Sequence, residues 1–391
     1  MTAFIGVHLR FKKPAQRAKT LIVCSMDENG TTAGRHRRVL IYEYCSAGGK
    51  LFGKPPDPSL VREGEAMVRA LAESADDGLS MARFRSTGKT DDSLRRELVE
   101  QAEEADAAIV IAPEMDDCLA TLHEVLQVKL GARWIGCSAH DVRQASDKWR
   151  LSQRLATAGL PTPSTQLLRE VACCRTPARR RGLAEFFHRE SRYDGRVLIK
   201  RRIGCGGVGL RAFGSLDPLF AWLTARENGQ RDEDESLIVQ PLLPGLAASV
   251  AVLCGPGERR PLPACSQRVA LSPHFAYHGG ETPLPAHLDK RAKQLAVAAV
   301  EQIVPDARGW VGVDILLDPR VVPDSSHDDY IIEINPRVTT SVVGLAAAAE
   351  SSLVRAMIEI ARGRAADLSF APRRIRFSAV GIEHNSSPWI F

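Results

Sequence analysis

The stretch that decides the fold is YIIEINPR, residues 330–337. Glu333 and Asn335 lie two residues apart, so on a β-strand both side chains point to the same face. A second predicted strand, GVDILLD at 312–318, precedes this stretch, and antiparallel pairing can place Asp314 opposite that polar face. Two carboxylates and an amide oxygen are hard ligands of the kind that Mg²⁺ prefers next to phosphate groups. Taken alone, the same pattern also fits an acidic strand that faces solvent.

A glycine-rich loop follows another predicted strand near the middle of the chain. The strand VLIK, 197–200, ends in Lys200 and leads into GCGGVG at 204–209. The hexapeptide matches GxGxxG, but a dinucleotide-binding loop must open a helix, and residues 208–213 predict a strand instead. In a strand–loop–strand unit, glycine N–H groups can approach phosphate oxygens, and Lys200 adds a positive charge. A glycine-rich hairpin without a ligand is the alternative.

Two weaker signals lie on either side of this loop. Ser146, Asp147 and Lys148 stand at the start of a predicted helix, 146–158, where Asp147 can cap and Lys148 is ordinarily solvated. The apolar strand at 237–241 enters a proline-rich connection, which suits a hinge whose backbone pairs with an adenine edge.

The first part of the chain alternates predicted strands and helices. This alternation predicts an open parallel α/β sheet of about 100 residues. Ligands of such sheets lie beyond the carboxyl ends of the strands, where Glu43 and Glu114 stand. Ordinary surface charges are the alternative for both. The strands are expected at 39–45, 107–112 and 134–137, and the helices at 59–73, 94–104 and 117–130.

After about residue 140 the pattern predicts an α+β region with a mainly antiparallel sheet. Two polar segments, 175–181 and 227–235, are expected to be solvated surface loops. The remaining strands are expected at 196–200, 208–213, 237–241, 248–254, 310–317 and 329–335, with helices at 290–303 and 345–362.

Composition limits the classes of protein that remain. The chain has 391 residues, more than the roughly 250–300 at which a single core stops growing, so two or three domains are expected. A net charge of +5 and only 6% aromatic residues argue against a nucleic-acid binder, and no apolar run is long enough to span a membrane. Residues 1–38 carry eight basic and two acidic side chains. The net charge of this segment therefore exceeds that of the whole chain. Nine cysteines without a CxxC pair favour a reduced, cytoplasmic location.

Together these motifs, in this order, resemble the ATP-grasp superfamily from residue 39 to about 365. The resemblance implies an α/β plus α+β fold, with an N-terminal, Rossmann-like pre-ATP-grasp domain and two lobes that hold ATP between them. The expected domains are a basic arm at 1–38, the pre-ATP-grasp domain at 39–140, lobe A with the glycine loop at 141–240 and lobe B with the metal site at 241–391.

The resemblance also implies roles for individual residues. Lys148 and Lys200, with Gly206 and Gly207, would contact the phosphates of ATP, and Gln240 and Leu242 would flank adenine. Two Mg²⁺ ions, or Mn²⁺ as an alternative, would be bound by Asp314, Glu333 and Asn335. Arg337 and Lys200 would be catalytic, Arg337 by stabilising the phosphorylated substrate. One departure is the sequence Gly245-Leu246-Ala247, which stands where many hinges of the family carry GRE, so the acid that would hold the ribose is missing there.

Within the superfamily, several segments are similar to the tyramine–glutamate ligases of methanofuran biosynthesis. They are YEY at 42–44, EGEAM at 63–67, APE at 112–114, YHGG at 277–280 and NPRVTTS at 335–341. The similarity implies an ADP-forming carboxylate–amine ligase that uses an acyl phosphate and joins the γ-carboxylate of glutamate to tyramine. Glu43, Glu114, Tyr277 and Thr339 are the expected substrate-binding residues.

The expected partners of such an enzyme are therefore a small carboxylate and a small amine, with no nucleic acid and no membrane. Two alternative functions stay open from the sequence: a ligase for another amino acid or dipeptide, and a non-catalytic ATP sensor. Assembly as a homodimer also stays open.

Overall fold

The structure is a computed structural model. It describes residues 37–51, 53–86, 90–174, 176–190, 192–204, 207, 209–226, 236–270, 276–320 and 328–383. The basic arm up to residue 36, Gly206 and the polar segment 227–235 lie outside the described residues. The arm was predicted to reach residue 38, but Arg37 and Arg38 already belong to the first strand.

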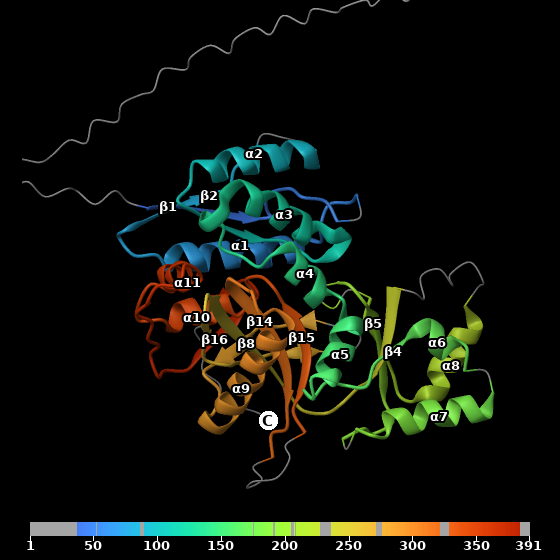
Figure 1. The fold of residues 1–391 in the computed structure, drawn as a ribbon. Helices are drawn as coiled ribbons and strands as arrows, with labels where there is room; N and C mark the ends of the chain where they lie inside the picture. Colours follow the sequence, from blue (N-terminus) through green and yellow to red (C-terminus); the bar gives the residue numbers. More distant parts are fainter. Residues whose placement is uncertain are drawn as a thin grey trace, which may run out of the picture. The chain divides into compact units, whose positions relative to one another are not determined.

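A three-stranded parallel sheet opens the described chain, in the order β2 (Leu79–Arg83), β1 (Arg37–Glu43) and β3 (Ala107–Ile111). Helix α1 (Pro58–Glu73) covers one face, and α2 (Asp91–Glu103) and α3 (Cys118–Leu130) cover the other (Figure 1). The parallel pairing of these strands confirms the predicted α/β sheet. The sequence could predict it because most of β1 and all of β3 are buried apolar residues, as is typical of parallel strands.

Two details of this sheet differ from the expectation. Strand β2 was not predicted, because only one of its five residues is buried and the residues show no clear alternation of apolar and polar side chains. The strand expected at 134–137 is wrong: a 3₁₀ turn, η2 (Gly131–Arg133), leads into a single parallel bridge between Trp134 and Ala108.

A four-stranded antiparallel sheet carries the glycine loop. Its order is β4 (Gln166–Leu167), β7 (Leu237–Pro241), β5 (Val197–Arg201) and β6 (Arg211–Phe213). Because β5 and β6 pair antiparallel on either side of the glycine loop, the strand–loop–strand prediction is confirmed. Helices α6 (Leu168–Ala172), α7 (Pro177–Phe187) and α8 (Leu216–Ala225) complete this part of the chain (Figure 1).

Helix α7 overturns the expected surface loop at 175–181. The Thr176 hydroxyl caps it by accepting from the backbone N–H of Arg179, and Pro177 takes the first turn, where its missing N–H costs nothing. Leu183 and Phe187, four residues apart, are the buried side of the helix. The run of three arginines therefore lies on a helix and not in a loop.

The second antiparallel sheet carries the acidic strands. Its order is β10 (Cys265–Ser266), β8 (Leu246–Gly255), β14 (Gly309–Leu317) and β15 (Tyr330–Asn335), and β9 (Glu258–Pro261) also pairs with β8. Alternate residues of β8 join two different buried clusters, one shared with α9 (Ala286–Ile303) and one with α11 (Leu353–Ala361). The two helices therefore cover opposite faces of the sheet.

The helix expected at 345–362 is two helices, α10 (Val342–Ala348) and α11. Ala349 bridges to Phe370 between them, and the Ser352 side chain caps α11. Among the smaller strands of this region, β11 (Val269–Ala270) pairs with β12 (Ala276–Tyr277). Strand β16 (Ile375–Ser378) lies between β13 (Gly280–Thr282) and β17 (Gly381–Ile382) and pairs with both. The described helices include none with the length and apolar character of a membrane span.

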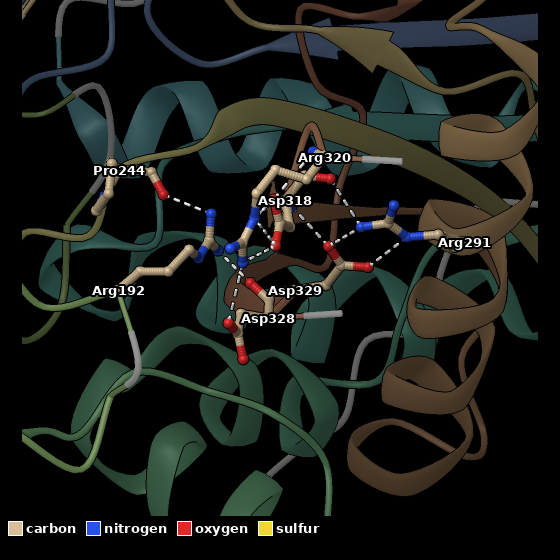
Figure 2. Close-up of polar contacts among 7 residues, drawn as sticks. All are labelled: Arg192, Pro244, Arg291, Asp318, Arg320, Asp328 and Asp329. Carbon is tan, nitrogen blue, oxygen red and sulfur yellow. Dashed lines mark hydrogen bonds and ion pairs between the residues drawn. The ribbon is translucent and has the colours of Figure 1, made fainter. Parts of the chain in front are cut away.

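A cluster of arginines and aspartates fixes the neighbouring ends of β14 and β15 (Figure 2). The Asp329 carboxylate accepts from the backbone N–H of Asp318 at 2.7 Å and pairs with Arg291 of α9. Arg192, which precedes β5, donates to the carbonyl oxygens of Pro244 and Asp328. The cluster therefore connects both antiparallel sheets near the connection from β7 to β8.

Candidate active site

Asp314, Glu333 and Asn335 gather on one face of the β14–β15 pair, as predicted. Asp314 stands directly opposite Glu333 in the register, and the Asn335 side-chain amide donates to Asp314 Oδ2 at 3.1 Å. Gln267 donates to Asp314 Oδ1 at 2.9 Å, and Ser249 of β8 also hydrogen-bonds this carboxylate. Burial, together with the negative charge of Glu333, raises the pKa of Asp314 to about 6.

Lys200 of β5 and Lys148, the first residue of a helix, meet these carboxylates. Lys148 is buried, and its Nζ lies 2.9 Å from Glu333 Oε1 and 2.7 Å from the carbonyl oxygen of Gly204. Burial lowers the pKa of Lys200, on β5, to about 8, and the charges of Glu333 and Asp314 oppose this shift. The two lysines and two carboxylates thus form one charge cluster, in which Lys148 is buried and the other three side chains are half-buried.

The break between α4 (Ala139–Ser146) and α5 (Lys148–Thr157) positions Lys148. The helix predicted at 146–158 is α5, whereas α4 was not predicted. Asp147 between them has extended backbone angles and caps α5 by accepting from the N–H groups of Trp149 and Arg150. The same carboxylate also accepts hydrogen bonds from Nε and Nη2 of Arg202, at 2.8 and 2.7 Å. Because Arg202 directly follows β5, this pair ties the start of α5 to the base of the glycine loop.

The donor set fits Mg²⁺. Within the part of the chain that the structure describes, no three His, Cys, Asp or Glu side chains gather as a metal site, and the set here is two carboxylates with an amide. All three supply oxygen atoms, the donors that Mg²⁺ requires. Asp314 and Glu333 also repel each other, because their carboxylates stand on opposite positions of two paired strands. A divalent cation would offset this repulsion.

Arg337 is held by Glu114. Its Nε lies 2.8 Å from Glu114 Oε1 and its Nη2 lies 3.3 Å from Glu114 Oε2, and the two side chains are 13% and 4% exposed. The second predicted acid of the first sheet, Glu43, accepts from the backbone N–H groups of Cys45 and Ser46. Burial raises the pKa of Glu43, and the charge of Arg337 opposes this shift. The carboxyl ends of β1 and β3 therefore both supply acids near Arg337.

The other two predicted substrate residues lie around the same region. Thr339 accepts from the Trp310 indole N–H at 3.3 Å and shares a hydrogen bond with Ser341. Tyr277 is half-buried on β12, and burial and the charges of Glu63 and Asp314 raise its pKa well above the usual range. Glu63 of α1 accepts a hydrogen bond from the Thr340 hydroxyl. Sequence reasoning did not single out Glu63, although it starts the EGEAM segment.

The hinge residues have partners of their own. The Gln240 side-chain amide donates to the Thr165 hydroxyl at 2.7 Å, and the backbone N–H of Leu242 donates to the carbonyl of Arg196 at 2.9 Å. A Cβ at Gly245 would lie 2.8 Å from the carbonyl oxygen of Leu317, so only glycine fits there. Gly207 has a positive φ of 68°, which glycine adopts without strain.

Comparisons with known proteins agree with this architecture. The family model described as an ATP-grasp domain matches residues 145–341, and the one described as a pre-ATP-grasp 3 domain matches residues 69–142. A tyramine–L-glutamate ligase of Methanocaldococcus fervens is 24% identical over 339 residues, which cover 82% of this chain and 93% of that protein. One from Methanocaldococcus jannaschii is 23% identical over 327 residues, covering 78% and 84%.

Solved structures of low sequence identity share the fold. An ATP-grasp superfamily protein from Archaeoglobus fulgidus superposes with a TM-score of 0.59 at 22% identity, covering 90% of this chain and 95% of that chain. The D-alanine–D-alanine ligase of Bacillus anthracis in complex with ATP superposes with a TM-score of 0.54 at 16% identity, covering 83% and 97%. With its sheets, its charge cluster and these matches, the chain belongs to the ATP-grasp family.

Proposed function

We propose that this chain is an ATP-dependent ligase that joins a carboxylate to an amine through an acyl phosphate. The observation that carries this proposal is the charge cluster in which Lys148 and Lys200 meet Asp314 and Glu333, with Lys200 on one sheet and the two carboxylates on another. A protein that only senses ATP has no need for the complete set of phosphate-binding and metal-binding side chains. The match to the ATP-grasp domain supports ATP as the nucleotide.

The reaction that this cluster suits has two steps. A carboxylate oxygen of the substrate attacks the γ-phosphorus of ATP, the bond to the bridging oxygen breaks, and ADP leaves. The amine nitrogen then attacks the acyl carbon, inorganic phosphate leaves, and the nitrogen loses a proton to give the amide. No side-chain nucleophile takes part, so positioning and neutralisation of charge carry the catalysis.

The residues divide these tasks. Lys148 and Lys200 oppose the charge of the ATP phosphates, and Gly207 belongs to the loop that covers them. Arg337 opposes the charge that remains on the acyl phosphate. Asp314, Glu333 and Asn335 would hold Mg²⁺, which when bound neutralises phosphate oxygens as a Lewis acid.

Glutamate and tyramine are the proposed substrates. The support for them is the similarity to two tyramine–L-glutamate ligases, together with the acidic surroundings of Arg337. Glu43 lies near Arg337, and Glu63 lies near Tyr277. The two carboxylates suit the ammonium group of a substrate, and the aromatic ring of Tyr277 suits the phenol ring of tyramine.

The test is phosphate release from MgATP across a panel of amino acids and amines, with mass spectrometry of the product. We expect release with L-glutamate and tyramine together and little with either alone. Phosphate release with another pair would support the ligase activity but contradict glutamate and tyramine as its substrates. Tight ATP binding without release from any pair would contradict the ligase and favour a sensor.

A further inference from the structure

We propose that Glu114, from the first sheet, is a positioning residue that fixes the guanidinium of Arg337 for the phosphorylated substrate. The inference rests on the proposed function, in which Arg337 opposes the charge of an acyl phosphate. It makes the parallel α/β sheet a working part of the active site, in addition to the two lobes that hold ATP.

The contact itself is a two-point pair. Nε and Nη2 of Arg337 face the two oxygens of Glu114, at 2.8 and 3.3 Å, across a separation of 223 residues in the sequence. Two parallel contacts fix the plane of a guanidinium, whereas one contact leaves it free to rotate. The third contact, from Nη1 to the carbonyl oxygen of Val338 at 3.3 Å, acts on the same plane.

Glu114 is itself held by a rigid surrounding. It follows β3 after two buried residues, and Met115 next to it is 2% exposed. The carbonyl of Pro113 accepts from the backbone N–H of Leu119, so the turn that carries Glu114 is fixed to the first turn of α3. A carboxylate on such a support can transmit the position of the sheet to Arg337.

Charge gives a second reason for the pair. Arg337 is nearly buried, and a buried cation without a partner is strongly unfavourable. Glu114 compensates this charge while no anion is present. The alternative is that the pair only joins the first sheet to the end of β15, without any role in the chemistry. The experiment must therefore separate positioning from stability.

The chain offers a matched control for stability. Glu281 on β13 is also nearly buried, at 3% exposure, and also pairs with arginines, Arg374 and Arg376. Glu281→Gln removes a comparable buried charge outside the proposed machinery. Glu114→Gln removes the charge of Glu114 with little change in volume, and Glu114→Asp keeps the charge but withdraws it by one methylene.

The first measurement is the formation of hydroxamate from L-glutamate, MgATP and hydroxylamine, which traps the acyl phosphate without the amine. We expect Glu114→Gln to lower kcat about 10- to 100-fold, the size of effect seen for residues that orient a functional side chain through a hydrogen bond. The KM for ATP and the Tm should stay close to those of the Glu281→Gln control. Glu114→Asp should recover part of the rate. An unchanged kcat in Glu114→Gln would overturn the proposal.

The second measurement does not depend on the substrates. The Nε–H signal of Arg337 in a ¹⁵N correlation spectrum, identified by its loss in Arg337→Lys, should be slow to exchange with water in the wild type. We expect Glu114→Gln to broaden or shift it and Glu281→Gln to leave it in place. An unshifted, equally protected signal in Glu114→Gln would overturn the proposal. If wild-type protein forms no hydroxamate from L-glutamate, the proposed substrate fails, and this signal still decides the role of Glu114.

Discussion

At the scale of single residues, Lys200 is the most direct test of the nucleotide site. It reaches from β5 toward the carboxylates of Glu333 and Asp314, although each belongs to the other sheet. Lys200→Met should weaken MgATP binding about 10- to 100-fold, because a charge-assisted hydrogen bond contributes about 1.5–3 kcal/mol. Isothermal titration calorimetry measures the Kd. Lys129→Met, at an exposed position in the last turn of α3, is the control. An unchanged Kd in Lys200→Met would remove Lys200 from the phosphate site.

Asn335 tests the metal assignment. Its amide is the third oxygen donor beside Asp314 and Glu333, and in the structure it also donates to Asp314. Asn335→Ala should abolish phosphate release while thermal unfolding followed by circular dichroism shows a folded protein. Gln302→Ala, an exposed amide on α9, should leave the activity unchanged. Full activity in Asn335→Ala would contradict the assignment of these three residues to Mg²⁺.

At the scale of elements, periodicity was enough to predict the strands that carry chemistry. Strands β5, β14 and β15 are apolar runs with polar residues at fixed positions. The pattern therefore predicted that β14 pairs with β15 and that Asp314 lies on the same face as Glu333 and Asn335. Overlooked capping signals explain the misses. Thr176 and Pro177 begin α7, and Ser138 caps α4, which was not predicted.

The side-chain partners of the site were beyond prediction for a different reason. Glu114 was predicted as a substrate-binding acid, but its partner Arg337 lies 223 residues away, just past the end of β15 in another sheet. Glu63 and Thr340 are 277 residues apart. Such contacts depend on how two sheets pack, which a period of two or 3.6 residues does not specify. The roles of all the predicted site residues stay predictions until the variants are measured.

The cluster at the ends of β14 and β15 makes stability depend on pH (Figure 2). Hydrogen bonds from the Arg320 side chain hold the pKa of Asp318 at about 2, below the usual value of a carboxyl. The folded state therefore gains stability above about pH 4 that is lost as pH falls toward 2. Asp318→Asn should lower the free energy of unfolding at pH 7, and its difference from wild type should shrink as pH falls from about 4 to about 2. Urea unfolding measures this difference, and a constant one would contradict the assignment.

At the scale of the whole described chain, the buried residues form unequal cores. The parallel sheet shares its core with the sheet that carries β14 and β15: residues of β1, α1, β8 and α11 belong to one cluster. The sheet that carries the glycine loop has a cluster of its own, which includes Phe187, Val197 and Val239. Polar contacts that join this sheet to the rest include Arg192 with the carbonyl of Asp328 and the carbonyl of Gly204 with Lys148. A small separate core supplies less apolar burial to oppose unfolding.

Unequal cores predict unequal opening, which hydrogen exchange measures. Peptides from α6, α7 and β5 should exchange through local unfolding of lower free energy than peptides from β8 and β14. MgATP should then slow exchange in β5 and around β14–β15 together, because the nucleotide would join Lys200 to Asp314 and Glu333. Helix α2, on the far face of the first sheet, is the internal control and should change least. Equal protection of β5 and β8 without nucleotide would show that the two sheets unfold as one unit. Protection by MgATP in one sheet alone would contradict a phosphate site built from both.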